Sequence, residues 1–178
     1  NRPVRGYHDN AIIFWDLYPQ KLREQFTHSF TVGLSSPARR ITENKWMETF
    51  ANMMGQIVKC PHCGAEVFLD ERKEETGVAH TCWNCQGVVQ MPVSIVVEKY
   101  RVLITSDTKL YRHHLYNDGD METVVGSISV NPKNPQLWGI KNETDGVWTY
   151  IKADRSHVPI APGRSAAIVK GAQIHFGT

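Results

Sequence analysis

Four cysteines, arranged as two pairs, are the residues of this chain best suited to chemistry. Each pair has the spacing Cys-x2-Cys, and 18 residues separate one pair from the other. A gap of two residues lets both sulfurs of one tight turn reach a metal ion at about 2.3 Å, and tetrahedral coordination needs two such turns. The spacing therefore predicts one structural zinc ion, bound by Cys60, Cys63, Cys82 and Cys85.

The residues next to the cysteines indicate how the two turns are built. Gly64 and Gly87 follow the two pairs, and we expect both glycines to supply the positive φ angle of a tight turn. The strands that leave the turns are expected at residues 66–69 and 88–90. Trp83 lies inside the second pair, where it is either an exposed contact for another protein or a cover for the metal.

Three other roles for these residues fit the pattern less well. A redox Cys-x-x-Cys motif occurs singly within a βαβ unit, whereas two motifs occur together here. A catalytic zinc ion keeps one coordination position open for water, whereas four thiolates close the shell. His62 and His80 flank the cysteines and could each replace a sulfur as ligand. With four sulfurs present, we expect both histidines to be exposed residues of the turns.

The charge of the cysteine segment bears on the partner that it could bind. Residues 61–92 carry two Lys or Arg residues and five acidic residues, a net charge of −3. Phosphate contacts dominate the affinity of proteins for DNA and RNA, so a segment that binds nucleic acid should present a basic face. The sequence therefore favours a structural or protein-docking role. The acidic residues are Glu66, Asp70, Glu71, Glu74 and Glu75.

No catalytic motif accompanies the cysteines. The chain has no Gly-x-Ser-x-Gly elbow, no phosphate-binding glycine loop and no His-Glu-x-x-His helix, so we expect no enzymatic activity. His113 and His114 precede two aspartates and could suggest a second metal site. We expect these histidines in a strand, where adjacent side chains point to opposite faces and cannot share one ion.

Composition and length are those of an ordinary globular protein. Hydrophobic residues make up 41% of the 178 residues, and the formal net charge is +2. No apolar run approaches the roughly 20 residues that span a bilayer. Because all the cysteines lie in the two pairs, none is left for a disulfide framework, which suits a reducing cytoplasm. The first residues resemble the interior of a longer chain, so we expect the sequence to be a fragment.

Three segments are expected to position these residues, and together they predict an α+β fold. Residues 1–58 form a helical hairpin, residues 59–92 form the four-cysteine ribbon, and residues 93–178 form an all-β domain. In the last segment, short β-branched or aromatic runs alternate with turns rich in Asn, Asp, Gly and Pro. The expected strands lie at 95–97, 101–104, 123–130, 137–140, 147–151 and 172–176.

The helical hairpin is predicted from two apolar stripes. One helix follows Pro19 and ends near Gly33, and the other begins after Thr42. The stripes consist of Leu22, Phe26 and Phe30 in the first helix and of Trp46, Phe50, Met53 and Ile57 in the second. Two amphipathic helices bury little surface by themselves, so we expect their aromatic faces to need a partner surface.

A wider pattern joins the two helices. It consists of Phe14-Trp15-Asp16-Leu17-Tyr18-Pro19, Leu22-Arg23-Glu24-Gln25-Phe26, Phe30-Thr31-Val32-Gly33 and Arg40-Ile41-Thr42-Glu43-Asn44-Lys45-Trp46. This pattern resembles the end of a protein kinase C-terminal lobe, with Ile41 in place of a family proline. The glycine-rich loop, the catalytic loop and the Asp-Phe-Gly motif of kinases are absent. The resemblance implies that any kinase activity resides upstream of Asn1.

The last segment contains Leu137-Trp138-Gly139-Ile140-Lys141-Asn142, Val147-Trp148-Thr149-Tyr150 and Gly171-Ala172-Gln173-Ile174-His175-Phe176-Gly177. In these runs it resembles a forkhead-associated (FHA) domain, a β-sandwich that binds phosphothreonine peptides. The Gly-Arg and Ser-x-x-His motifs of functional members are incomplete here. If the pocket is retained, the resemblance implies phosphate contacts from Arg112, Ser127 and Ser129, with Asn142 and Thr144 holding the peptide backbone.

A kinase tail, a four-cysteine ribbon and an FHA-like domain, in this order, resemble the bacterial protein kinases associated with tellurite resistance. The resemblance implies stress signalling, with a von Willebrand factor A-type domain protein and a metal-dependent protein phosphatase as partners. We therefore expect a non-catalytic regulatory and docking region of a protein kinase. A nucleic-acid-binding zinc ribbon and a phosphopeptide reader are the alternative functions.

Overall fold

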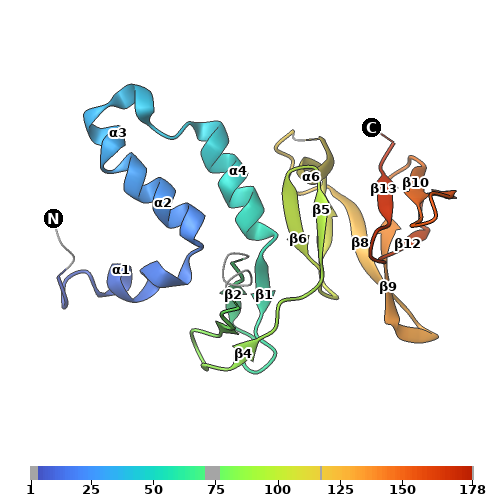
Figure 1. Ribbon diagram of the computed structural model, residues 1–178, viewed down its shortest axis with the longest axis horizontal. Helices are drawn as coiled ribbons and strands as arrows, with labels where there is room; N and C mark the ends of the chain where they lie inside the picture. Colours follow the sequence, from blue (N-terminus) through green and yellow to red (C-terminus); the bar gives the residue numbers. More distant parts are fainter. Residues whose placement is uncertain (1–3, 71–76, 117, 178) are drawn as a thin grey trace. The chain divides into compact units, whose positions relative to one another are not determined.

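The computed structural model describes residues 4–70, 77–116 and 118–177 of the chain. Its fold is α+β, with helices near the N-terminus followed by small sheets (Figure 1). The chain divides into two compact units, of which the first comprises Asn1–Ser94 and Tyr100–Leu103 and the second Ile95–Lys99 and Ile104–Thr178. The predicted segments 1–58 and 59–92 thus share one unit, and their division stays a prediction. No described helix has the length and apolar character needed to cross a membrane.

The helices of the first unit are short and follow one another closely. They are α1 (Asp9–Phe14), η1 (Trp15–Leu17), α2 (Gln20–Ser29), α3 (Val32–Ser35), η2 (Pro37–Arg39) and α4 (Glu43–Met54). The two predicted helices are confirmed as α2, which follows Pro19, and α4, which follows Thr42. Between them lie α3 and η2; α2 ends at Ser29, and Gly33, the predicted end of the first helix, lies inside α3.

The second helix ends earlier than its apolar stripe predicts. Ile57 belongs to strand β1 (Ile57–Lys59), so its predicted position on the helix is wrong. The reason is a close backbone approach at Gly55, where an added Cβ would lie 2.7 Å from the carbonyl oxygen of Arg101. The Gly55 carbonyl accepts a hydrogen bond of 2.9 Å from the N–H of Leu103, in strand β6 (Tyr100–Leu103). Tertiary pairing therefore overrides the helical periodicity at this point.

Aromatic side chains join α2 to α4. The Phe26 ring lies 5.1 Å from that of Trp46 in an edge contact, and the rings of Phe30 and Phe50 stack against these two. Phe30 is nevertheless 63% exposed and Phe50 is 44% exposed. The aromatic stripes thus meet each other but leave an open apolar face, as expected of two helices that bury little surface by themselves.

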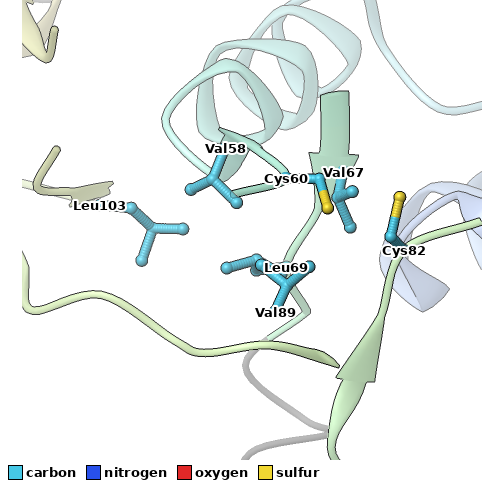
Figure 2. Close-up of a cluster of buried hydrophobic side chains, with 7 residues drawn as sticks. All are labelled: Val58, Cys60, Val67, Leu69, Cys82, Val89 and Leu103. Atoms are coloured by element: carbon cyan, nitrogen blue, oxygen red, sulfur yellow. The ribbon is translucent and has the colours of Figure 1, made fainter. Parts of the chain in front are cut away.

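Two short hairpins carry the cysteines, and we call them the cysteine hairpins. In the first, β1 pairs in antiparallel fashion with β2 (Glu66–Phe68), and in the second β3 (His80–Thr81) pairs with β4 (Val88–Val89). The predicted strands after the two turns are confirmed as β2 and β4. Figure 2 shows the small core of these hairpins, formed by Val58, Cys60, Val67, Leu69, Cys82, Val89 and Leu103.

The second unit consists mainly of two antiparallel sheets. One sheet has the order β12-β9-β8-β7, and the other has the order β11-β10-β13. The Trp148 side chain of β10 is fully buried and reaches the four-stranded sheet, where an added Cβ at Gly126 would lie 3.2 Å from its ring. The strands are β5 (Ser94–Val97), β7 (Lys109–Tyr111), β8 (Val124–Asn131), β9 (Asn134–Asn142), β10 (Trp148–Ile151), β11 (His157–Ile160), β12 (Ser165–Ala167) and β13 (Gln173–His175).

One helix interrupts the region that was expected to be all-β. Residues Arg112–Tyr116 form the short helix α6, directly after β7. His113 and His114 therefore do not point to opposite faces of a strand, and that prediction is wrong. Both rings are buried, and their centroids lie 3.9 Å apart. The backbone N–H of His113 donates a hydrogen bond of 2.9 Å to the carbonyl of Asp120.

Candidate metal centre

The two cysteine hairpins bring four sulfur atoms together. All four Sγ atoms of Cys60, Cys63, Cys82 and Cys85 lie within 4.8 Å of one another. Contacts of 3.7 Å between Cys60 and Cys85 and of 3.6 Å between Cys63 and Cys82 join one hairpin to the other. A zinc–sulfur bond of about 2.3 Å implies a tetrahedron with edges of about 3.8 Å. The two cross-hairpin contacts therefore match the edges of a tetrahedral thiolate site.

The same distances bear on the redox alternative. A disulfide requires a sulfur–sulfur separation of about 2.05 Å, and all four cysteines are free. Two independent redox pairs would not require their sulfurs to meet, whereas here the sulfurs of one hairpin contact those of the other. The arrangement of the four sulfurs therefore favours one shared ligand over two separate dithiols.

The backbone of the two cysteine turns follows one pattern. In each turn the first cysteine N–H donates to the carbonyl of the residue five positions later: Cys60 to Ala65 and Cys82 to Gly87, both at 2.8 Å. The N–H four positions later returns a bond to that cysteine's carbonyl, from Gly64 in one turn and from Gln86 in the other, both at 2.9 Å. The two turns thus present their sulfurs in the same way, as a closed tetrahedral site requires.

The two glycines of the turns have different roles. Gly64 has a φ of +74°, as predicted, and a Cβ at this position would meet nothing within 4 Å. Gly87 lacks a positive φ, and the equivalent backbone position in the second turn is Gln86, with a φ of +61°. The prediction for Gly87 is therefore wrong. An added Cβ at Gly87 would lie 2.6 Å from Cδ2 of His62, so this glycine makes room for a ring of the opposite hairpin.

Hydrogen bonds and desolvation shape the ionisation of two of the thiols. The backbone N–H of Ala65, followed by Asn84, lowers the pKa of Cys63 to about 6. The backbone N–H of Gly87 also lowers the pKa of Cys85, but desolvation and the three neighbouring sulfurs outweigh it and raise that pKa to about 12. Cys63 therefore favours the thiolate, whereas Cys85 favours the protonated thiol. A divalent cation would relieve this conflict, because it offsets the charge of several thiolates at once.

The aromatic residues beside the cysteines occupy distinct places. His62 is exposed, as predicted, whereas His80 is buried in β3, so the prediction of an exposed His80 is wrong. The reason is register, because His80 lies opposite the buried Val89 in the β3–β4 pair. The Trp83 ring is 44% exposed, and its Nε1–H donates to the carbonyl of Glu66 at 2.9 Å. This bond ties one cysteine hairpin to the other.

The cysteine hairpins also hold the start of a helix. The backbone N–H of Gln20, at the first position of α2, donates to Oδ2 of Asp70 at 3.0 Å. Pro19 precedes it and has no hydroxyl or carboxylate with which to cap the helix. A carboxylate from a residue 50 positions away therefore takes the part of an N-cap. No local pattern could have predicted this contact. The other acidic residues that the sequence singled out include Glu71, Glu74 and Glu75, which lie outside the described residues.

The residues expected to contact phosphate are engaged within the second unit. Nε of Arg112 donates to Asp118, and its guanidinium lies 4.5 Å from the centre of the Tyr116 ring. Ser127 donates its hydroxyl to Glu143 at 2.6 Å, and the Ser129 hydroxyl donates to Ser165 at 2.8 Å. The two serines lie two positions apart in β8 and so share one face of the strand, opposite Lys141 and Gly139 of β9. The structure thus pairs each of the three side chains with neighbours of its own unit.

The residues expected to hold a peptide backbone instead hold a turn of this chain. Asn142 is fully buried, and its amide donates to the carbonyls of Gly146 and Ile160 at 2.7 and 3.0 Å. Its Oδ1 accepts from both the backbone N–H and the hydroxyl of Thr144, at 2.9 and 2.7 Å. Since these four bonds use the hydrogen-bonding capacity of the amide, Asn142 serves the fold between β9 and β10.

Comparison of the chain with models of protein families, with characterised proteins and with solved structures gave no match. The case for a function therefore rests on the geometry of the chain itself. The four sulfurs are the one group of three or more His, Cys, Asp or Glu side chains in the described residues that could hold a metal ion.

Proposed function

We propose that Cys60, Cys63, Cys82 and Cys85 bind one structural zinc ion and that the cysteine hairpins form a zinc ribbon. The observation that carries this proposal is the spacing of the four sulfurs, all within 4.8 Å of one another, with cross-hairpin contacts close to the edge of a zinc–thiolate tetrahedron. When bound, the metal would supply cross-links between two hairpins whose shared core, within the described residues, contains seven buried residues. A core of this size rarely keeps a fold stable by itself.

Four protein ligands leave no position for a water molecule or a substrate, so the proposed ion is structural. Tetrahedral thiolates suit iron as well as zinc, and the metal must therefore be identified by measurement. A reducing compartment such as the cytoplasm would keep the four thiols available, which is consistent with the free cysteines.

The proposed zinc ribbon belongs to a non-catalytic regulatory and docking region. The open aromatic face of α2 and α4 supports a docking role, because large exposed apolar surfaces mark sites of protein contact. We further propose that the region comes from a bacterial protein kinase of the group associated with tellurite resistance. In this proposal the second unit is the FHA-like sandwich. A von Willebrand factor A-type domain protein and a metal-dependent protein phosphatase are the partners to test.

Metal analysis tests the zinc proposal. We expect one zinc ion per chain by native mass spectrometry and the absorption of a tetrahedral thiolate complex when cobalt replaces zinc. Cys82→Ser should lower the metal content, and chelation should increase hydrogen exchange in residues 57–69 and 77–89 more than in the second unit. A folded chain that binds no metal, or that unfolds equally with and without a chelator, would refute the proposal.

Calorimetry tests the docking proposal. The zinc-loaded chain is titrated with a purified von Willebrand factor A-type domain protein from the same gene neighbourhood as the parent kinase. Binding that weakens when Phe50 is changed to Ser, with the zinc content unchanged, supports docking through the helical face. The absence of binding at concentrations near 100 µM would exclude this protein as a partner. The zinc proposal would be unaffected by that result.

A further inference from the structure

A cavity of about 500 Å³ lies within the first unit, between the segment that contains α1 and η1 and the cysteine hairpins. One wall includes Phe14, Asp16 and Tyr18, and the other includes Glu66, Phe68 and Trp83. This volume falls within the range of about 300–1,000 Å³ that is typical of ligand sites. We call this cavity and its two walls the aromatic groove.

Aromatic rings from the two walls face each other across the aromatic groove. The Phe14 and Trp83 rings meet edge to face at 6.3 Å, and the Tyr18 and Phe68 rings meet at 5.9 Å with a tilt of 45°. Phe14, Tyr18 and Trp83 each remain about 40% exposed. The rings therefore support one another without filling the space, and ring surface stays open to a ligand.

The Trp83 side chain is held in place from two directions. Its backbone lies between the metal-ligating positions Cys82 and Cys85, and its Nε1–H donates to the Glu66 carbonyl on the other hairpin. The bound zinc ion would fix both hairpins and hence this ring. A pre-organised ring loses little conformational freedom when a ligand binds, which favours affinity.

The charges on the walls select the ligand. Asp16 and Glu66 are the acidic residues that line the cavity, and no Lys or Arg stands among the described residues that line it. Asp16 forms an ion pair with Arg23 at 2.7 Å, whereas Glu66 is exposed at the start of β2, opposite Lys59 of β1. Aromatic faces attract cations through their quadrupole, and a nearby carboxylate adds to that attraction. Phosphate groups would be repelled, so the stacking of nucleic acid bases is disfavoured here.

We propose that the aromatic groove binds an extended peptide segment of a partner protein through a Lys or Arg side chain flanked by apolar residues. The apolar stem of the cationic side chain would lie along Phe14 and Trp83, with its charged end toward Glu66. Ile13 and Leu17 line the same cavity and would receive a neighbouring apolar residue of the peptide. This inference deepens the proposed docking function and rests on the zinc-bound form of the hairpins.

Fluorescence anisotropy of labelled peptides tests the inference on the full zinc-loaded chain. The probes are three heptapeptides, Gly-Leu-X-Leu-X-Leu-Gly, with X as Lys, Gln or Glu. We expect the Lys peptide to bind about tenfold more tightly than the Gln peptide and the Glu peptide to bind most weakly, with the preference falling as salt rises. Equal binding of all three peptides would show a non-specific apolar surface and overturn the inference.

Variants locate the site. Glu66→Gln keeps the size of the side chain but removes its charge, and Tyr18→Leu removes a ring from the wall that carries no cysteine. Each substitution should weaken the binding of the Lys peptide about five- to tenfold. The matched controls are Glu24→Gln, an exposed carboxylate on α2, and Tyr116→Leu, which is 41% exposed like Tyr18 but lies on α6, outside the residues that line the cavity. Neither control should change the affinity.

The zinc content of every variant is measured alongside. Unchanged affinity in Glu66→Gln and Tyr18→Leu, with zinc retained, would overturn the groove while leaving the proposed zinc ribbon intact. A chain without zinc would instead refute the zinc proposal. Tighter binding of a single-stranded oligonucleotide than of the Lys peptide, or competition for the groove by a second copy of the chain, would also overturn the inference.

Discussion

Gly64→Ala and Gly87→Ala should each destabilise the cysteine hairpins, but for different reasons. At Gly64 the cost is conformational, because a φ of +74° places an L-residue in the left-handed region although the space around it is open. That region costs roughly 1–2 kcal/mol for a residue with a Cβ, and a stiffer unfolded chain offsets up to about 1 kcal/mol of it. We expect a net loss of about 1 kcal/mol.

At Gly87 the cost is steric, because the new methyl group would lie 2.6 Å from the His62 ring and 3.3 Å from the Cys85 sulfur. Overpacking costs about 1–3 kcal/mol. The His62 side chain is exposed and can move aside, so the lower end of that range, about 1 kcal/mol, is expected. The two substitutions should therefore lower the stability of the hairpins by similar amounts but for different reasons.

Zinc affinity, measured by competition with a chromophoric chelator at fixed pH, reports both losses, because only the folded hairpins would hold the ion. A loss of about 1 kcal/mol appears as a roughly fivefold weaker affinity. His62→Ala should rescue Gly87→Ala, since it removes the colliding ring, and should leave the defect of Gly64→Ala unchanged. If His62→Ala rescued both variants or neither, the separation of steric and conformational causes would be refuted.

Three further predictions concern other parts of the chain. Asn142→Asp should destabilise the second unit by about 3–5 kcal/mol in denaturant unfolding, because a carboxylate would face two buried carbonyls, whereas Thr144→Val should cost only about 1 kcal/mol. Burial and the neighbouring His113 lower the pKa of His114 to about 4. The unfolded chain therefore binds a proton that the folded chain does not, and roughly 3 kcal/mol of stability should disappear as the pH falls from 6.5 to 4, a loss that His114→Gln should lack. Asp70→Ala should lower the thermal stability of the first unit by about 1 kcal/mol, with increased hydrogen exchange in the first turn of α2.

The meeting of the four sulfurs could be predicted from the sequence because the information is local. A Cys-x2-Cys spacing determines the turn, and the turn determines where the sulfurs point. The space at Gly87 could not be predicted in the same way, because the atom that fills it belongs to His62 on the other hairpin. The positive φ at Gln86 could not be predicted either, because sequence patterns assign that conformation to glycine.

The errors in the fold have the same origin. Ile57 continues an apolar helical stripe, yet it pairs with Phe68 in a strand because the backbone of β6 approaches Gly55 too closely for the helix to continue. His113 and His114 follow a strand-like run, but local hydrogen bonding to Tyr111 and Asp120 turns them into a helix. Periodicity describes which side chains could share a face, and tertiary contacts decide which element forms.

The role of a polar residue such as Asn142 depends on its burial, which the sequence does not show. A sequence lists an amide without showing whether it faces solvent or the interior, and the same residue type suits a ligand contact or a structural turn. Here a fully buried Asn142 closes the turn between β9 and β10.

The cysteine hairpins connect three features that are far apart in the sequence. Their sulfurs converge on one point, Asp70 at the end of the first hairpin holds the start of α2, and Trp83 in the second hairpin forms one wall of the aromatic groove. The core that supports these features is small, so their mutual arrangement depends on whatever cross-links the hairpins. A structural metal at the four sulfurs would therefore act on docking indirectly, by fixing the helix start and the tryptophan that a partner would meet.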